Sequence, residues 1–263
     1  MNRRPSFKIS RRFLRVWQRN AVVYRKIWKV SFLTPLLEPL FYLLAFGYGM
    51  SALIGKVSFE GQELSYVVFI TPSLLAIAMM YNAFFENTYA SFVRMYYQKT
   101  FDAMLATPLS LEEVITGEIV WGATKSLIAT AIMLGVVSAF GLAHYPHVLL
   151  ILPLSFLAGI AFGSIGMFFT GVIPSIEAFN LPIFLFVTPM FLFSGTFFPV
   201  TGLPGWAQDL ALIFPLTHAV NATRYLCLGV MAADVLWAVC YLVVFSLVFF
   251  PLALVVMQRR LIR

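Results

Sequence analysis

Long apolar runs dominate the hydrophobic pattern of this chain, and six of them occur between residues 30 and 257. A helix that crosses a hydrocarbon layer about 30 Å thick needs about 20 mostly apolar residues. The runs are continuous and lack the alternation with a period of two residues that is typical of membrane β-barrels. The pattern therefore predicts an all-α integral membrane protein with six spanning helices. The predicted spans are Val30–Ile54, Leu64–Tyr89, Ile119–Gly141, Val148–Val172, Leu181–Phe198 and Val235–Met257.

Composition and charge agree with a membrane protein whose two termini are cytoplasmic. Charged residues make up only 11% of the 263 residues and hydrophobic residues 61%, whereas soluble domains carry about 25% charged residues. Ten of the 18 basic residues lie within residues 1–29, so the net charge of +7 does not indicate a nucleic-acid partner. With both termini inside, every Lys and Arg except Lys56, Lys125 and Arg224 falls in a cytoplasmic segment, as the positive-inside rule requires.

Residues 1–29 form a basic, amphipathic stretch before the first predicted span. Apolar and aromatic residues recur there at helical spacing, and most basic residues lie elsewhere around the helix. The apolar face consists of Phe13, Val16, Trp17, Tyr24, Ile27 and Trp28. Such a helix lies in the membrane interface with its basic side toward anionic head groups. The alternative is that the stretch only anchors the topology.

Between the fifth and sixth predicted spans, residues 199–234 are too apolar for a solvated loop and are interrupted by Pro199, Pro204 and Pro215. Non-helical backbone persists at membrane depth only where protein or water satisfies its polar groups. We therefore expect short helices that dip into the outer leaflet and pack against the other spans.

Four ionisable residues lie within or beside the predicted spans: Glu38, Glu86, Glu118 and Lys125. An ionisable group in hydrocarbon costs about 3 kcal/mol or more, so each needs a partner or a wet cavity. Glu118 and Lys125 are seven residues apart and therefore share a helix face. These residues line a substrate path or clamp helices together. The alternative places Glu86 and Glu118 in the cytoplasmic interface, with Lys125 extending toward it.

The motifs that resemble catalytic or metal sites do not fit the required patterns. Gly49–Val57 has five residues between its glycines and a valine after the lysine, so it is not a phosphate-binding loop. His144 and His147 have no carboxylate nearby in sequence. Gly159 and Gly163 have the small-xxx-small spacing of closely packed membrane helices. We therefore predict neither an enzyme nor a metal site, and no cofactor in this chain.

The segment between the second and third predicted spans carries one apolar patch. Phe101, Met104 and Leu105 stand at i, i+3 and i+4. Asp102 lies beside them, and Pro108 ends the run. A short helix with an exposed apolar patch is marginal in water and favours a partner surface. The alternative is that the patch packs back onto the ends of the chain's own helices.

Several motifs resemble those of a known family. Ser194-Gly195-x-Phe197-Phe198-Pro199, Leu203-Pro204 and Pro215-Leu216-x-His218, with Arg224 six residues later, are similar to the C-terminal third of ABC-2 type exporter permeases. In the middle of the chain, Phe101-Asp102-Ala103-Met104-Leu105 and Ile115-x-Gly117-Glu118-x-x-Trp121-x-x-Thr124-Lys125 resemble NodJ-type permeases, the lipooligosaccharide exporters of nodulating bacteria. The similarity covers most of the chain.

This resemblance implies a six-span permease of the bacterial inner membrane that contacts membrane lipids and works as a dimer. We expect the dimer to consist of two copies of this chain. Each subunit would bind a separate cytoplasmic ATPase, which would hold the ATP and Mg²⁺. By position, Phe101–Pro108 would be a coupling helix that seats in a groove of the ATPase, and residues 1–29 would be an interfacial helix near it. Pro199–Leu228, which includes His218 and Arg224, would form re-entrant helices that close the path on the periplasmic side.

The expected function is therefore outward movement of a glycolipid or lipooligosaccharide-like substrate. Export of drugs or other lipids is the alternative within the same family. A second class is an ion-coupled carrier that uses Glu38 and Lys125 as a charge relay, although no internal repeat is apparent. A third is an intramembrane enzyme acting on lipid, for which no nucleophile–base pair is found.

Overall fold

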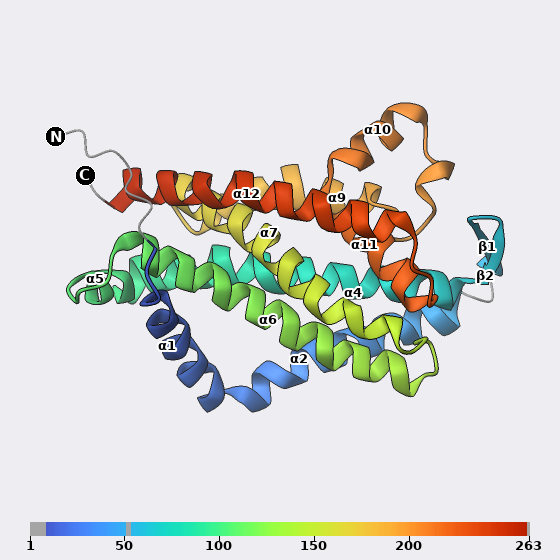
Figure 1. Ribbon diagram of the computed structural model, residues 1–263, viewed down its shortest axis with the longest axis horizontal. Helices are drawn as coiled ribbons and strands as arrows, with labels where there is room; N and C mark the ends of the chain where they lie inside the picture. Colours follow the sequence, from blue (N-terminus) through green and yellow to red (C-terminus); the bar gives the residue numbers. More distant parts are fainter. Residues whose placement is uncertain (1–8, 51–53, 262–263) are drawn as a thin grey trace.

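The computed structural model describes residues 9–50 and 54–261, with the backbone alone described at residues 30, 34–36, 38–39, 43 and 47–48. Long helices run side by side and form an elongated bundle (Figure 1). The N-terminal elements are α1 (Phe13–Lys26), α2 (Trp28–Tyr42), the π-helical η1 (Leu43–Met50), β1 (Lys56–Phe59) and β2 (Gln62–Ser65). The central elements are α4 (Tyr66–Phe85), η2 (Glu86–Ala90), η3 (Val93–Tyr97), α5 (Thr100–Leu105) and α6 (Leu111–Ala139). Then follow η4 (His147–Leu150), α7 (Ile151–Val172), η5 (Glu177–Phe179), α8 (Asn180–Pro182), η6 (Ile183–Val187), α9 (Thr188–Phe193), η7 (Val200–Gly202), α10 (Gly205–Ile213), α11 (Pro215–Cys227) and α12 (Ala233–Leu261).

Four of the described helices are long and apolar enough to cross a membrane: Tyr66–Tyr97, Leu111–Ala139, His147–Val172 and Ala233–Leu261. They coincide with the second, third, fourth and sixth predicted spans. The fifth predicted span corresponds to the shorter helical segment Glu177–Phe193, which stops before Ser194 and Gly195 because Gly195 has a φ of +72°. The first corresponds to α2 and η1, whose side chains are described only in part. The complete six-span topology therefore stays a prediction.

A β-hairpin precedes α4 in the segment between the first and second predicted spans, and it includes the first two residues of the second span. β1 and β2 pair antiparallel, with Phe59 opposite Gln62 and a two-residue turn of Glu60 and Gly61. Both turn residues have positive φ, 51° and 75°. Two positive φ values in a two-residue turn match the twist of the flanking strands and favour a hairpin. The second span therefore begins at Tyr66 rather than at Leu64.

α6 begins at Leu111, eight residues before the predicted start at Ile119. The hydroxyl of Ser110 accepts a hydrogen bond from the backbone N–H of Glu113, and the Glu113 carboxylate accepts one from the N–H of Ser110. This capping box satisfies two N–H groups that have no partner within the helix. The extra turns place Gly117 and Glu118 inside the helix rather than in a loop.

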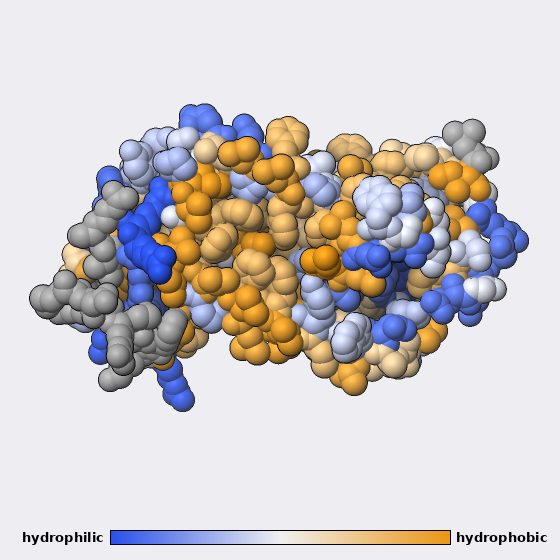
Figure 2. All heavy atoms as spheres, turned by 90° about the horizontal axis from the view of Figure 1, so that it is seen from above, coloured by the Kyte–Doolittle hydropathy of each residue, from blue (hydrophilic) through white to orange (hydrophobic). Residues whose placement is uncertain are grey.

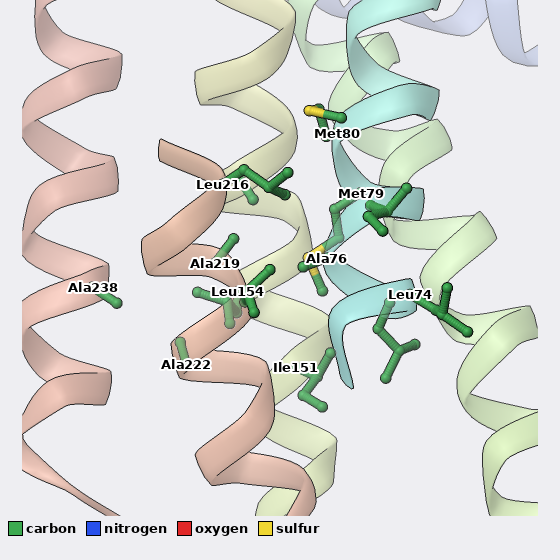
Figure 3. Close-up of a cluster of buried hydrophobic side chains, with 14 of the residues drawn as sticks. Leu74, Ala76, Met79, Met80, Ile151, Leu154, Leu216, Ala219, Ala222 and Ala238 are labelled. Atoms are coloured by element: carbon green, nitrogen blue, oxygen red, sulfur yellow. The ribbon is translucent and has the colours of Figure 1, made fainter. Parts of the chain in front are cut away.

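The core lies where α4 meets α6, α7 and α11, and α7 also packs against α12. Figure 3 shows small side chains such as Ala219 and Ala238 among larger ones such as Met79 and Leu154. α6 and α7 approach closely: a Cβ on Gly159 would lie 2.6 Å from a backbone atom of α6. The close packing expected of the glycine spacing in α7 is confirmed at this position.

The outer surface has the pattern of a protein embedded in lipid. Figure 2 shows hydrophobic side chains across the middle of the viewed face and hydrophilic side chains gathered toward both ends. Long apolar side chains on α12, such as Leu236 and Leu247, are 68% exposed. Such exposure is unfavourable in water over so large an area and is compatible with a hydrocarbon solvent.

Candidate functional site

Three of the four predicted intramembrane charges come together in one buried ion-pair network. The Arg94 guanidinium lies 2.8 Å from Glu86 Oε1 and 2.5 Å from Glu118 Oε2. On the other side, Lys125 Nζ lies 2.8 Å from Glu86 Oε2. We call Glu86, Arg94, Glu118 and Lys125 the charged cluster. Its two cations and two carboxylates compensate one another, which is the condition under which burial of such groups is tolerated.

Glu118 is the most deeply buried member, with no exposed surface. Besides Arg94, it accepts hydrogen bonds from Asn20 Nδ2 on α1 (2.8 Å) and Ser91 Oγ (2.9 Å). One carboxylate therefore joins α1, the helix that follows α4, and α6. This geometry supports the clamp between helices. Lys125 extends to Glu86, a contact that fits both this clamp and the alternative in which Lys125 extends toward the interface.

Arg94, Asn20 and Ser91 were not among the predicted site residues. Glu86 and Arg94 lie in π-helical turns, η2 and η3, whose backbone pattern i→i+5 carries an extra residue per turn. An analysis with a period of 3.6 residues therefore misjudges which side chains share a face. The one available signal was charge balance, since two buried carboxylates and one lysine require a second cation. Glu38, the fourth predicted residue, has its side chain outside the described residues.

α1 packs against α6 through the face that the sequence predicts. Val16 is 1% exposed, and a Cβ on Gly117 would lie 2.5 Å from the Val16 Cβ. Trp121 meets two aromatic rings of α1, those of Trp17 at 6.3 Å and Tyr24 at 5.6 Å between centroids. Burial, followed by the charge of Glu86, raises the pKa of Tyr24, so its hydroxyl stays neutral. The predicted helix is therefore present from Phe13 to Lys26, and its position in the membrane interface stays a prediction.

The end of that predicted apolar face behaves differently. Ile27 and Trp28 are each 54% exposed, because α1 stops at Lys26 and the chain turns there into α2. They are therefore more exposed than the other residues of that face.

A pocket of about 710 Å³ lies between α1 and α2 on one side and α4, η2, η3 and α6 on the other. We call it the cluster pocket, because Glu86, Arg94 and Lys125 form part of its wall. Its volume falls in the range of about 300–1,000 Å³ typical of ligand sites. The charged cluster therefore borders a space large enough for a ligand.

The predicted coupling segment forms a short helix, α5, at the end of the bundle where α12 ends (Figure 1). Asp102 and Ala103 are exposed, and Met104 and Leu105 are half-buried. Phe101 has no exposed surface, because it belongs to an apolar cluster separate from the core described above. We call it the second apolar cluster, and its buried members include Val16, Phe92, Val114 and Met257. For Phe101 the structure therefore shows the alternative, in which the patch packs back onto the chain's own helices, and Met104 and Leu105 pack in part against the same cluster.

Pro108 is exposed and follows α5, and its backbone carbonyl links the segment to the N-terminal helix. The Arg12 guanidinium donates a hydrogen bond to the Pro108 carbonyl at 2.8 Å. Ser10 also donates to the Glu113 carboxylate at the start of α6. The segment is thereby connected to the start of α1, and the residues just before α1 are connected to the start of α6.

The segment after the fifth predicted span contains the expected short helices. Pro199 and Pro204 immediately precede η7 and α10, and Pro215 is the first residue of α11, where a proline needs no N–H partner. α11 packs against α4 and α12. His218 on α11 stacks on the Tyr241 ring at 3.8 Å and contacts the Leu212 carbonyl at 2.9 Å.

Arg224 on α11 is the largest fully buried side chain of this segment. It donates hydrogen bonds to Ser73 Oγ and to the Gly195 carbonyl, both at 2.8 Å, and lies 4.0 Å from the Phe69 ring centroid. Within residues 9–50 and 54–261 it forms no ion pair, and its Nε has no hydrogen-bond partner. Arg224 therefore ties α11 to α4 and to the bend after α9.

No described group of three or more His, Cys, Asp and Glu residues is arranged to hold a metal ion. His144 Nδ1 instead lies 2.8 Å from the Cys227 carbonyl, where it connects the loop after α6 to the end of α11.

Comparison with known proteins gives one family and several relatives. Residues 11–228 match the family model described as ABC-2 type transporter. The chain is 36% identical over 254 residues to "Nodulation protein J" of Rhizobium leguminosarum bv. trifolii, an alignment that covers 97% of this chain and 95% of that protein. It is also 36% identical to the protein of that name from Rhizobium meliloti strain 1021, over 95% and 94% of the two chains. It is 23% identical to "Inner membrane transport permease YadH" of Escherichia coli K12, over 93% of each chain.

Proposed function

The chain belongs to the ABC-2 type transporter family, and we propose that it is the permease subunit of an exporter that moves a glycolipid or lipooligosaccharide-like substrate outward, driven by a separate ATPase. The observation that carries this proposal is α5, a short helix at one end of the bundle with an exposed outer face and a buried anchor. Such a helix is suited to docking on a partner and transmitting its movement to the spans.

The way α5 is held supports this role. Phe101 fixes it to the second apolar cluster, while Asp102 and Ala103 are exposed on the outer side of α5. The connections to Arg12 and to α6 continue toward the charged cluster. A displacement of α5 would therefore act on α1 and on the helices that border the cluster pocket. An ATPase that binds two arrangements of these helices with different affinity would shift their equilibrium.

The proposal includes the location and assembly of the protein. Both termini and α5 lie in the cytoplasm of a bacterium, and the chain crosses the inner membrane six times. Residues 1–29 include the interfacial helix, and residues 30–263 form the transmembrane domain. Two copies of the chain assemble as a homodimer with two ATPase subunits, which bind the ATP and Mg²⁺. α10, α11 and Arg224 close the path at the outer side.

The substrate class rests on similarity and on the pocket. Relatives at 36% identity over nearly the whole chain are named nodulation protein J. The cluster pocket combines aromatic side chains with polar ones, which suits a ligand with both a ring-containing and a charged or hydroxylated part.

The test is co-purification with an ABC ATPase that is co-expressed with this chain. Charged residues at Met104 and Leu105 should abolish the association, but both side chains are half-buried and such changes also disturb packing. Ala103→Arg is sharper because Ala103 is exposed, and it should remove most of the bound ATPase. Gln62→Arg, an equally exposed change on the hairpin at the other end of the molecule, should leave the complex intact.

The outcome is decided by the comparison of the two variants in the same membrane. If Ala103→Arg retains the ATPase as well as Gln62→Arg does, α5 is not the docking helix. Transport by the purified chain alone under a proton gradient, without ATP, would contradict the proposed function and favour an ion-coupled carrier.

A further inference from the structure

The cluster pocket has an excess of positive charge. Three cations, Arg19, Arg94 and Lys125, form part of its wall. Glu86 also lines it, and Glu118 lies directly behind Arg94. Three positive charges therefore face two negative ones among the described residues.

Arg19 is the pocket cation that takes no part in the ion pairs of the charged cluster. Its guanidinium donates to the Oδ1 of its neighbour Asn20 at 2.8 Å, and it forms no ion pair with any described carboxylate. Burial lowers its pKa, whereas the charge of Glu118 raises it. A guanidinium in a partly buried wall with only a neutral partner is positioned for an incoming anion.

The remaining lining has two further features. Rings from four elements line the pocket: α1, α4, η2 and α6. Among them are Tyr24, Tyr89 and Trp121. Such rings offer large apolar faces with polar edges. At the rim, Val23 and Ile27 are apolar and 44% and 54% exposed. A ligand with a polar ring-containing head and an apolar tail matches both features.

We propose that the cluster pocket binds the head group of a singly anionic amphiphile that enters from the adjacent leaflet, with Arg19 contacting its negative charge. The aromatic rings stack on the apolar faces of the head group, and the tail leaves past Val23 and Ile27. This inference rests on the proposed function and narrows its substrate class to an amphiphile with one net negative charge.

The first test measures lipid preference in nanodiscs of phosphatidylcholine. A pyrene-labelled phosphatidylglycerol, which has one negative charge and a polyol head, is compared with pyrene-labelled phosphatidylcholine by energy transfer from tryptophan. Phosphatidylglycerol should bind more tightly. Arg19→Gln should weaken this preference roughly tenfold, the effect of losing one hydrogen bond to a charged group.

Arg15→Gln is the matched control, because it removes the same charge from the same helix. Arg15 is exposed, bonds to Gln18 and does not line the pocket. It should change the preference less than twofold. Equal binding of the two lipids, or equal effects of the two variants, overturns the proposal.

A second measurement does not depend on the stability of the Arg19 variant. Two cysteine variants are made in a Cys240→Ser background. Ser31→Cys places a thiol on α2 in the pocket wall, and Ser138→Cys places one on α6 away from the residues that line the pocket. Phosphatidylglycerol should slow maleimide modification at position 31 and not at position 138. Protection by soluble glycerol 3-phosphate to the same extent would identify a free anion as the ligand and refute the amphiphile.

These tests separate the two levels of the argument. If Arg19→Gln retains both the ATPase and undiminished ATP-driven export, the pocket assignment fails and the proposed function stands. If Ala103→Arg retains the ATPase, the docking proposal fails whatever the lipid results show.

Discussion

Removal of Arg94 should destabilise the folded protein more than removal of any exposed cation. Arg94 is 13% exposed and supplies the only described cation in contact with Glu118, which has no exposed surface. In Arg94→Met, Glu118 keeps only the hydrogen bonds from Asn20 and Ser91. The substitution thus leaves a buried carboxylate without a compensating charge, while the methionine retains much of the apolar volume.

The expected loss follows from the burial of the pair. Removing one partner of a buried ion pair costs about 3–5 kcal/mol. We expect the lower end, about 3 kcal/mol, because Lys125 still compensates Glu86 at 2.8 Å. This loss corresponds to a change of roughly 100-fold in the unfolding equilibrium. The double variant Arg94→Met/Glu118→Gln removes both charges of the pair and should recover at least about 1 kcal/mol.

The assay is equilibrium unfolding in mixed micelles, followed by tryptophan fluorescence and helical circular dichroism. Arg15→Met is the control, because Arg15 is exposed and should change the free energy of unfolding by less than about 0.5 kcal/mol. The reasoning is refuted if Arg94→Met is as stable as Arg15→Met. It is also refuted if the double variant is less stable than the single one, because neutralising Glu118 would then bring no relief.

Two further predictions concern the packing of α1 and the outer segment. Gly117→Ala should release α1 from α6, because the added Cβ would lie 2.5 Å from the Val16 Cβ. Protease cleavage near residue 12 should therefore increase. Gly135→Ala is the control and should leave cleavage unchanged, because its Cβ would have nothing within 4 Å. Arg224→Lys should loosen the bend after α9, because a lysine does not reproduce the planar guanidinium that bonds both α4 and the Gly195 carbonyl. Faster amide exchange around residue 195, without change in the hairpin, would confirm that role, and equal exchange would contradict it.

The charged cluster shows where inference from the sequence reaches its limit. Glu118 and Lys125 could be placed on one face because α6 is a regular helix. Arg94 could not be assigned to the same site, because the π-helical turns of η2 and η3 shift the register between it and Glu86. The contact from Asn20 depends on the docking of α1 and has no local signal.

The coupling segment shows a second limit. The spacing of Phe101, Met104 and Leu105 predicted a helix with one apolar face, and α5 is such a helix. The sequence left open whether that face meets a partner or the chain itself. The packing of α6 and the second apolar cluster buries Phe101, whereas Asp102 and Ala103 stay exposed at the surface.

By itself, the sequence determined the membrane class of the protein, the approximate position of four spans, the amphipathic α1 and the short helices after Pro199, because hydrophobicity, periodicity and proline act locally. The tertiary structure alone decided that Arg94 balances two carboxylates, that Arg19 is left without an ionic partner among the described residues, and that a pocket lies between them. The physical reason is that ion pairing and enclosure depend on distances between helices, which packing sets and local patterns do not contain.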